Sequence, residues 1–373
     1  MKSMPKRQIL LNPGPLTTSD RVKQSLIVED ICPREKEFGI LCAGLTKSLK
    51  EVVCAGDDYE AVLFSGSGTA GVEAAISSVV ADDEAILIAD NGAYGSRMYE
   101  IACAYYRPDQ VFRLKLPHTG RVSAEDVGEF LQKHPNIRYV ALVHHETTTG
   151  MLNPAEEILK TVHRFKAFLI LDVMSSFAGI PMDFRTSPYD LVISSSNKCL
   201  QGMPGLSFVL CNKDQIRKSA QLKPRGLYLN LRKQFDFFER TLQMQFTPPV
   251  QICYALRAAL DEFFAEGMTA RHERYRKSWM VLTEGLKNMG FKLLLPDEYQ
   301  SGLLTAVKEP DDPGYSFESM HDYLKQRAIT VYPGKTGEAD TFRIANIGDI
   351  DERDIRFFLS ALKDYLTDRS IRL

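Results

Sequence analysis

Lys198 is the residue in this chain whose setting most strongly suggests chemistry. It lies in DLVISSSNKCLQGMPG (190–205), where an apolar run typical of a buried strand gives way to serines, an asparagine, the lysine and glycines. A lysine at such a turn can bond covalently to the aldehyde of a cofactor, although a lysine taken alone is more often a solvated surface residue. A second chemical group at the same edge of the fold would favour the first interpretation.

Asp172 supplies that second group. It ends the apolar run AFLILDV (167–173), and Lys198 follows the next apolar run in the chain. Ligands of open parallel sheets bind beyond the carboxyl ends of the strands, so both side chains are expected at the same edge. An aspartate here could also cap a helix, but the shared edge favours a catalytic pair.

A glycine-rich turn, SGSGTAG (65–71), follows the strand-like YEAVLFS (59–65) and begins a helical stretch. Backbone N–H groups at a helix N-terminus, together with the hydroxyls of Ser67 and Thr69, form a site for a phosphate whatever the phosphate is attached to. A tight turn that binds nothing would also need glycine. The turn therefore indicates a phosphate site without identifying the cofactor.

Two cofactors compete for this turn. Its glycines follow the pattern G-x-G-x-x-G (Gly66, Gly68 and Gly71), and Asp90 ends the next strand, which is the placement that an NAD-dependent dehydrogenase needs for pyrophosphate and ribose. Pyridoxal phosphate requires a phosphate site at a helix N-terminus, an acid for the pyridine nitrogen and a lysine. A dehydrogenase has no need of the aspartate and the lysine described above, so their presence favours pyridoxal phosphate.

Segments spread over nearly the whole chain resemble the fold-type I, class V aminotransferases: LLNPGPLTTSD, SGSGTAGVEAA, NGAYGSRM, HHETTTGMLNP, LDVMSSFAGIP, SSSNKCLQGMPG and TPPVQICYALRAAL. The resemblance implies a pyridoxal-phosphate-dependent transaminase. HHETTTG and SSSNKCLQG point, within the family, to members that act on 2-aminoethylphosphonate and pyruvate. Members that act on alanine and glyoxylate, or on serine and pyruvate, share this layout and stay open as alternatives.

The resemblance also implies roles for individual residues around the cofactor. Lys198 would bond to the cofactor and move the proton, and Asp172 would hold the pyridine nitrogen. The remaining contacts would come from residues near the phosphate, the ring and the phenolic oxygen of the cofactor: Ser67, Gly68, Thr69 and Asn197 at the phosphate, Tyr94 on the ring, and Thr147 at the phenolic oxygen.

Three further residues carry expectations about the substrate and the subunits. Thr247 of FTPP would reach the phosphate of the neighbouring subunit's cofactor, which implies a homodimer with shared sites. Arg343 of TFRIANIG would hold a substrate carboxylate or phosphonate, because the planar guanidinium can bind two oxygens at once. Arg34 of CPREKEF is a second candidate for the dianionic head of the substrate.

Two other groups are expected to be structural. HHE (144–146) suggests a metal, but adjacent strand residues point to opposite faces and the chain has no H-x-x-x-H spacing, so no metal site is predicted. Cys199, beside the lysine, is expected to be a small buried apolar residue rather than a nucleophile.

The elements that must position these residues alternate along the first two thirds of the chain. Apolar strand-like runs are separated by helical stretches of about a dozen residues, which indicates a parallel sheet covered on both faces. The predicted strands are YEAVLFS, EAILIAD, QVFRLKL, RYVALVHHE, AFLILDV and YDLVIS. The resemblance implies that this α/β fold is a mostly parallel seven-stranded sheet.

The chain is expected to divide into an N-terminal segment (1–17), a large α/β domain (18–265) and a smaller α+β domain (266–373). The region from residue 251 is strongly helical, with a break at Gly267 and a stop at Gly290. The smaller domain is predicted to contain four strands and a last helix: FKLLLP (291–296), GLLTAV (302–307), AITVYPG (328–334), TFRIANIG (341–348) and ERDIRFFLSALKDYL (352–366).

Composition limits the partners. The 373 residues carry 46 Lys and Arg against 48 Asp and Glu, with no basic tract for a nucleic acid or a membrane, so small-molecule partners are expected. The opening MKSMPKRQILLNPGP has too short an apolar run for a signal peptide or a spanning helix, which favours a cytoplasmic location. Seven scattered cysteines without a C-x-x-C pair predict free, buried thiols.

Overall fold

The computed structural model describes residues 7–334 and 339–373. A seven-stranded sheet forms its centre, with the strand order β2-β10-β9-β8-β5-β3-β4. Only β10 runs antiparallel to its neighbours, which confirms the expected mostly parallel sheet. The sequence of β10, LSFVLCN, was not among the strands predicted from the sequence. The strands are β2 (Tyr59–Ser65), β3 (Ala85–Asp90), β4 (Val111–Lys115), β5 (Ile137–Val143), β8 (Phe168–Asp172), β9 (Leu191–Ser195) and β10 (Leu206–Asn212).

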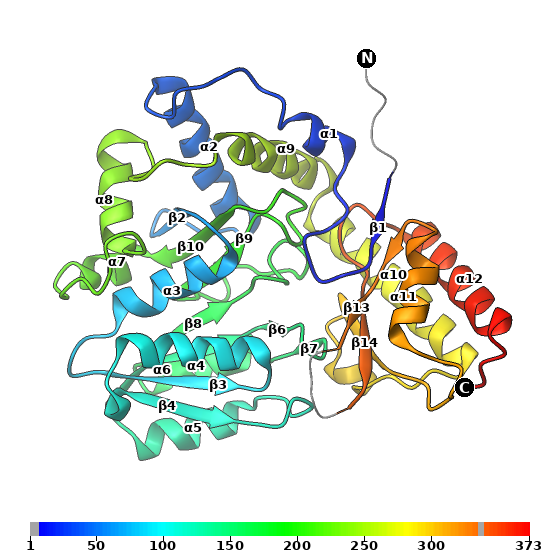
Figure 1. The fold of residues 1–373 in the computed structure, drawn as a ribbon. Coiled ribbons are helices and arrows are strands. Elements are labelled where there is room, and N and C mark those ends of the chain that lie inside the picture. The colour runs from blue at the N-terminus through cyan, green and yellow to red at the C-terminus, as the bar shows by residue number, and fades with distance from the viewer. Residues whose placement is uncertain (1–6, 335–338) are drawn as a thin grey trace.

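Helices cover both faces of the sheet, as Figure 1 shows. Alternate strand residues, such as Leu87 and Ile88 of β3, enter two different apolar clusters on opposite faces. One cluster is completed by α2 (Lys36–Val52), α5 (Ala124–Lys133), α6 (Ala155–Arg164) and α9 (Val250–Glu266). The other is completed by α3 (Gly68–Val79), α4 (Ala93–Tyr105), α7 (Lys213–Ser219) and the start of α8 (Leu231–Thr241).

The C-terminal part forms a smaller unit with a core of its own. An antiparallel sheet of β11 (Leu304–Lys308), β14 (Thr341–Ala345) and β13 (Tyr332–Pro333) packs against α10 (Met268–Met289), α11 (Phe317–Lys325) and α12 (Glu352–Asp368). Gly267 separates α9 from α10, and Gly290 ends α10 in the left-handed conformation with φ 103°, as the sequence predicted.

The N-terminal strand β1 (Ile9–Leu10) belongs spatially to this smaller unit, because it pairs with β12 (Ile329–Thr330). In Figure 1 the blue β1 lies beside the orange and red C-terminal elements. The chain then crosses to α1 (Asp20–Gln24), whose Val22 packs on α9. The crossing segment carries residues 11–19 past the carboxyl ends of the central strands.

One predicted strand of the smaller unit was wrong, and another is divided into two short strands. FKLLLP forms only the single bridge from Leu293 to Val307, because the chain bends at residues 294–295, and a 3-10 turn, η2 (Asp297–Tyr299), follows. AITVYPG changes partner at Val331, so that β12 pairs with β1 and β13 pairs with β14. The expectation of buried thiols was wrong for Cys32, Cys54 and Cys103, which are exposed.

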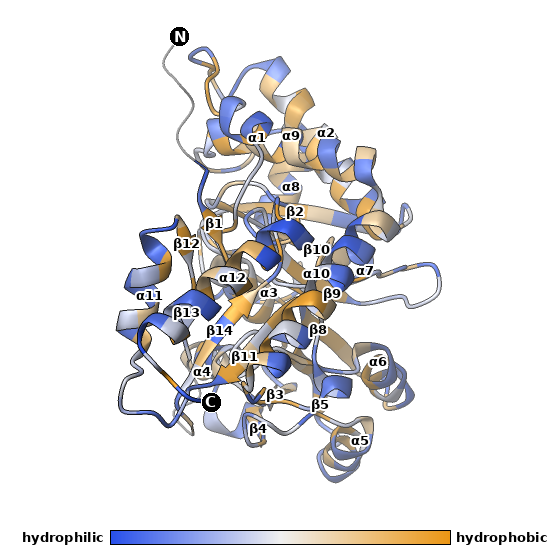
Figure 2. Cartoon of the chain, turned by 90° about the vertical axis from the view of Figure 1, so that its right-hand side faces the viewer, coloured by the Kyte–Doolittle hydropathy of each residue, from blue (hydrophilic) through white to orange (hydrophobic). Residues whose placement is uncertain are grey.

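Hydropathy follows this layering. In Figure 2 strand β9 is hydrophobic in colour, while the outer helices α5 and α6 carry both colours. This is the pattern of buried strands covered by amphipathic helices. Over the described ranges, no helix is both long and apolar enough to cross a membrane.

Candidate active site

A cavity of about 300 Å³ lies at the carboxyl ends of β8 and β9. The structure brings to it most of the residues singled out from the sequence: Ser67, Gly68, Thr69, Tyr94, Asp172, Asn197 and Lys198. These residues are far apart in the sequence, between positions 67 and 198, but they line one small cavity. The cavity is the candidate active site.

The phosphate cradle is formed by the start of α3. Gly66, with φ 144°, donates its N–H to the carbonyl of Gly205 at 2.9 Å, and Ser67 precedes the helix without using its side chain as a cap. A Cβ on Gly68 would lie 2.4 Å from the sulfur of Met174, so a side chain at this position would require Met174 to move. The N–H groups and hydroxyls at this helix N-terminus fit a phosphate.

Asp172 lies on the cavity wall with 5% of its surface exposed. Its Oδ1 accepts the N–H of Met174 at 2.8 Å. Burial raises the pKa of Asp172 to about 6, and the nearby cations Lys198 and Arg97 only partly oppose that rise. A buried carboxylate without a strong cationic partner among the described residues suits a protonated pyridine nitrogen, which would supply the missing charge.

Lys198 stands on the turn after β9 and is half-buried. Its Nζ donates to the main-chain carbonyl of Pro13, which comes from the crossing segment. A Cβ on Gly14 would lie 2.5 Å from that Nζ, so the backbone of NPGP passes against the lysine. The sequence reasoning used NPGP only as part of a resemblance, and it missed this contact.

Tyr94 and Arg97 stand on the same face of α4, one turn apart. Tyr94 lies in the first turn of the helix. The Arg97 guanidinium lies 5.0 Å from the centre of the Tyr94 ring and donates to Thr69 Oγ1 at 3.4 Å. Arg97 also lines the cavity, and sequence reasoning did not single it out although it lies in the quoted NGAYGSRM.

Glu146 holds the backbone at the start of α4, including that of Tyr94, by hydrogen bonds. Its fully buried carboxylate accepts the N–H groups of Tyr94 at 3.2 Å and Gly95 at 3.3 Å, and it also accepts the hydroxyl of Thr148 at 2.6 Å. A Cβ on Gly92 would lie 2.3 Å from Glu146 Cδ, so the carboxylate fits under the start of α4 only because residue 92 is glycine. Burial raises the pKa of Glu146 against these hydrogen bonds. The sequence reasoning missed this role.

The two histidines before Glu146 have separate partners. His144 Nδ1 lies 3.0 Å from Ser176 Oγ, and His145 Nε2 lies 2.8 Å from Ser301 Oγ. Burial lowers the pKa of His144 to about 4 and that of His145 to about 3, so both imidazoles are neutral at pH 7. They act as buried hydrogen-bonding groups in this structure.

Arg343 and Thr147 lie next to each other, behind Tyr94. Arg343 is 1% exposed and donates to the carbonyl of Thr147 at 3.0 Å and to that of Pro333 at 2.9 Å. It also hydrogen-bonds Tyr94, and its burial lowers its pKa. Neither Arg343 nor Thr147 is among the residues that line the 300 Å³ cavity, but Arg343 touches one that does.

Arg34 and Thr247 lie on a different surface. Arg34 donates to the carbonyls of Met244 at 2.7 Å and Gln245 at 3.2 Å. Thr247 is exposed, and its carbonyl accepts the hydroxyl of Ser65 at 3.4 Å. Within one chain the structure does not bring either side chain to the cavity.

The placement of Asp90 argues against the alternative of an NAD-dependent dehydrogenase. It is 2% exposed, and its Oδ2 accepts Arg113 Nε at 2.8 Å and Ser96 Oγ at 3.0 Å. A Cβ on Gly95 would lie 2.9 Å from Asp90 Oδ1. An acid held in this way under α4 cannot bind a ribose.

Comparisons with known proteins point to one family. A model described as Aminotransferase class-V matches residues 30–346. The chain is 40% identical over 358 residues to a 2-aminoethylphosphonate–pyruvate transaminase of Syntrophobacter fumaroxidans, with 95% of each chain covered. It is 39% identical to a protein of the same description from Phocaeicola vulgatus, with 95% of this chain and 98% of that one covered. An alanine–glyoxylate aminotransferase structure from Nostoc sp. superposes with a TM-score of 0.89 at 27% identity, with 98% of this chain and 97% of that one covered.

Proposed function

The chain belongs to the class-V aminotransferase family, and on this premise we propose that it transfers the amino group of 2-aminoethylphosphonate to pyruvate. The products are phosphonoacetaldehyde and alanine. The observation that carries the proposal is the single cavity that contains Lys198, Asp172 and the N-terminus of α3. Full-length relatives described by this activity support the choice of substrates.

Pyridoxal phosphate is the cofactor that this cavity fits, and the family depends on it. When bound, it supplies an aldehyde for the amine and a ring that withdraws electrons from the neighbouring carbon. The N–H groups at the start of α3, with Ser67, Thr69 and Asn197, would hold its phosphate. Tyr94 would lie on its ring, Thr147 would contact the phenolic oxygen, and Asp172 would pair with the pyridine nitrogen.

The proton transfers fall to Lys198. Within each half of the reaction its Nζ would act first as a base and then as an acid: it would take the proton from the carbon that carries the donor's amine and pass it to the cofactor, and with pyruvate as the acceptor it would move a proton in the opposite direction. Asp172 keeps a positive charge at the pyridine nitrogen, which makes that carbon more acidic. The carbonyl of Pro13 accepts a hydrogen bond from the free Lys198 amine.

The dianionic head of the donor needs fixed cations. Arg97 lines the cavity, and Arg343 hydrogen-bonds Tyr94 at its edge, so these two guanidiniums are the candidates within one chain. Arg34, which binds the 244–245 carbonyls, is a candidate only for a site that two subunits share.

A homodimer would bring Thr247 to such a shared site. The residue is exposed on the loop after α8, and the carbonyl of this loop contacts Ser65, which directly precedes the phosphate cradle. Sedimentation of the protein with the cofactor bound tests the dimer, and Thr247→Val should weaken cofactor binding in the dimer. A fully active monomer would contradict this part of the proposal.

The test of the function is an amine-donor screen with pyruvate as the acceptor, in which alanine is measured. We expect kcat/KM for 2-aminoethylphosphonate to exceed that for ethylamine, β-alanine and serine. The matched arm uses alanine with glyoxylate. If that pair, or serine with pyruvate, gives the higher kcat/KM, the protein is a carboxylate-specific aminotransferase and the phosphonate assignment fails.

A further inference from the structure

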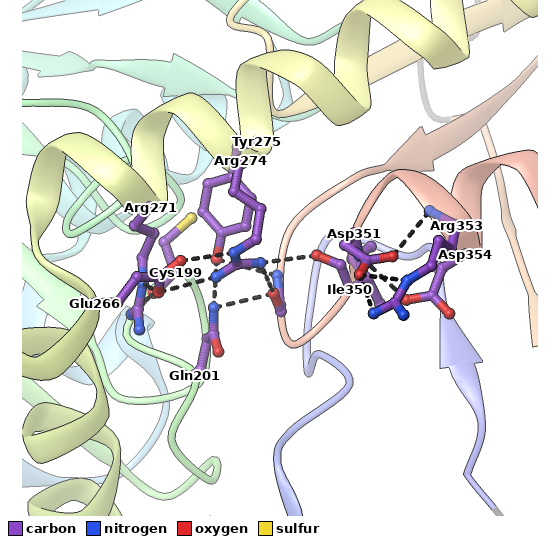
Figure 3. Close-up of polar contacts among 11 residues, drawn as sticks. Cys199, Gln201, Glu266, Arg271, Arg274, Tyr275, Ile350, Asp351, Arg353 and Asp354 are labelled. Carbon is purple, nitrogen blue, oxygen red and sulfur yellow. Dashed lines mark hydrogen bonds and ion pairs between the residues drawn. The ribbon is translucent and has the colours of Figure 1, made fainter.

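The turn that carries Lys198 has a second face, away from the active-site cavity. Asn197 and Lys198 line the 300 Å³ cavity, whereas Gln201 lines another cavity of about 610 Å³ together with Arg271 and Arg274 of α10. Figure 3 shows the polar side chains on this second face, which come from the turn, from the end of α9, from α10 and from the start of α12. The turn therefore lies between the cofactor site and the C-terminal unit.

The lysine turn, defined as residues 196–202, is closed by its own backbone. The N–H of Gln201 donates to the carbonyl of Lys198 at 2.7 Å, and the N–H of Gly202 donates to that of Ser196 at 2.8 Å. Gln201 has φ 65°, a left-handed conformation that strains the backbone of a non-glycine residue. A strained turn of this kind persists only when its surroundings hold it.

Two side chains of α10, those of Arg271 and Tyr275, hold the turn in place by hydrogen bonds. Arg271 Nη1 donates to the carbonyl of Cys199, the residue after the lysine, at 2.9 Å. The side chain of Gln201 donates to the hydroxyl of Tyr275 at 2.7 Å and to the carbonyl of Gly348 at 3.0 Å. Each of these contacts joins the lysine turn to the C-terminal unit and not to the sheet from which the turn emerges.

Arg271 is itself fixed in place. It is 1% exposed, its Nε donates to Glu266 at 2.7 Å, and its guanidinium lies 5.0 Å from the ring of Phe263. Glu266 binds Arg274 as well, at 2.7 Å, but Arg274 continues to the carbonyls of Gly348 and Ile350 instead of the turn. Two arginines thus share one carboxylate, and only Arg271 reaches the residue beside Lys198.

We propose that Arg271, with Tyr275 acting through Gln201, positions Lys198 by clamping the lysine turn to α10. The proposal rests on the proposed function in that Lys198 is the cofactor lysine. Arg271 does not line the active-site cavity and contacts none of the residues assigned to the cofactor, so it is a positioning residue. A guanidinium bound to a main-chain carbonyl in a buried site is among the stronger hydrogen bonds, so its loss should let the turn open more often.

Hydrogen exchange in the cofactor-free protein tests the clamp directly. Arg271→Met should raise exchange in the peptide 196–203 by roughly tenfold, since a charged hydrogen bond is lost. Arg274→Met is the matched control, because it removes the other partner of Glu266. Because Arg274 also donates to the Gly348 carbonyl that Gln201 uses, the variant should raise exchange mainly in 346–352, and in 196–203 clearly less than Arg271→Met does.

Tyr275→Phe gives a second variant that removes only a hydroxyl. It should also raise exchange in 196–203, and it keeps the test available if Arg271→Met does not fold. Unchanged exchange in 196–203 for both Tyr275→Phe and a folded Arg271→Met would overturn the proposal. An equal rise with Arg274→Met would also overturn it, since the effect would then be general loosening.

A spectroscopic arm uses the protein with pyridoxal phosphate bound. Arg271→Met should shift the pH midpoint of the cofactor's visible absorption band, and it should lower kcat more than it changes KM. Arg274→Met should do neither. Arg271→Lys should restore part of the wild-type midpoint. An unshifted midpoint in Arg271→Met would overturn the positioning role. If the wild type binds no cofactor, the proposed function fails, and the exchange experiment still decides the clamp.

Discussion

Lys198 Nζ donates a hydrogen bond to the carbonyl of Pro13, which stands 185 residues earlier in the chain. β1 is paired with β12 of the C-terminal unit, and the segment after β1 passes against Lys198 before it reaches α1. The lysine is therefore held from two sides. The N-terminal segment contacts its amine, and α10 contacts its turn through Arg271.

Gly14→Ala is predicted to disturb the lysine more than the fold. A Cβ there would lie 2.5 Å from Lys198 Nζ, and residue 14 has φ 125°, which alanine adopts only with strain. We expect the rate of cofactor attachment to fall by about tenfold or more, for a strain of about 1–3 kcal/mol. The measurement is the rise of visible absorbance after pyridoxal phosphate is mixed with cofactor-free protein.

Gly56→Ala is the matched control, because no atom lies within 4 Å of a Cβ at that position. Its attachment rate should equal that of the wild type. If Gly14→Ala attaches the cofactor at the wild-type rate, the NPGP segment does not restrain the lysine in solution.

Lys198→Arg is predicted to abolish covalent attachment while it keeps the positive charge. A guanidinium does not bond to the aldehyde, but the cradle at the start of α3 and Asp172 remain, so the cofactor should still bind reversibly. Borohydride treatment should fix the cofactor to the peptide that contains Lys198 in the wild type and to no peptide in the variant. Attachment to another lysine in the wild type would refute the assignment.

Asp172 should make the stability of the cofactor-free protein depend on pH. Burial raises its pKa from 3.8 to about 6, so the folded protein keeps a proton that the unfolded chain releases. This contribution is present below the unfolded pKa and is lost as the pH rises through about 6. Because each pKa unit is worth about 1.4 kcal/mol, the loss amounts to about 3 kcal/mol.

Asp172→Asn isolates this effect. His144 and His145 have depressed pKa values, so their contribution is lost as the pH falls below 6.5, which is the opposite trend. The difference in unfolding free energy between wild type and Asp172→Asn cancels the histidines and should shrink as the pH rises from about 4 to about 7. Asp183→Asn, at a half-buried acid that is paired with Arg185 and has a pKa of about 2, should show a nearly flat difference over the same range. A flat difference for Asp172→Asn as well would mean that Asp172 ionises normally.

Asp172 and Lys198 could be found from the sequence because each follows an apolar run, and the ends of parallel strands share one edge. Glu146 could not be found in this way. Its role depends on contact with Tyr94, 52 residues away, and on the absence of a side chain at Gly92. The segment HHE gives no local signal for a carboxylate that supports another helix.

The strands of the smaller unit were harder to predict for a related reason. FKLLLP and AITVYPG are both apolar enough for strands, but pairing partners decide which residues become strands. Residues 329–330 pair with the N-terminal strand, which no local pattern indicates. Likewise, Arg97 was missed because its importance comes from the Thr69 hydroxyl and the Tyr94 ring, both supplied by the folded cavity.

Arg343→Lys is predicted to separate the charge of the anion site from its geometry. The guanidinium uses its donors on the carbonyls of Thr147 and Pro333 and on Tyr94, and an ammonium cannot span these partners and a phosphonate together. We expect kcat/KM for 2-aminoethylphosphonate to fall by about tenfold to a hundredfold, the range for lost charged hydrogen bonds. The measurement is kcat/KM with pyruvate as the acceptor.

Attachment of the cofactor to Lys198 should be unaffected, because Arg343 is not part of the cavity lining. Arg34→Lys is the comparison at the second candidate. A loss with Arg34→Lys but not with Arg343→Lys would move the anion site to the surface near Thr247, and equal kcat/KM in the wild type and Arg343→Lys would exclude Arg343 from substrate binding.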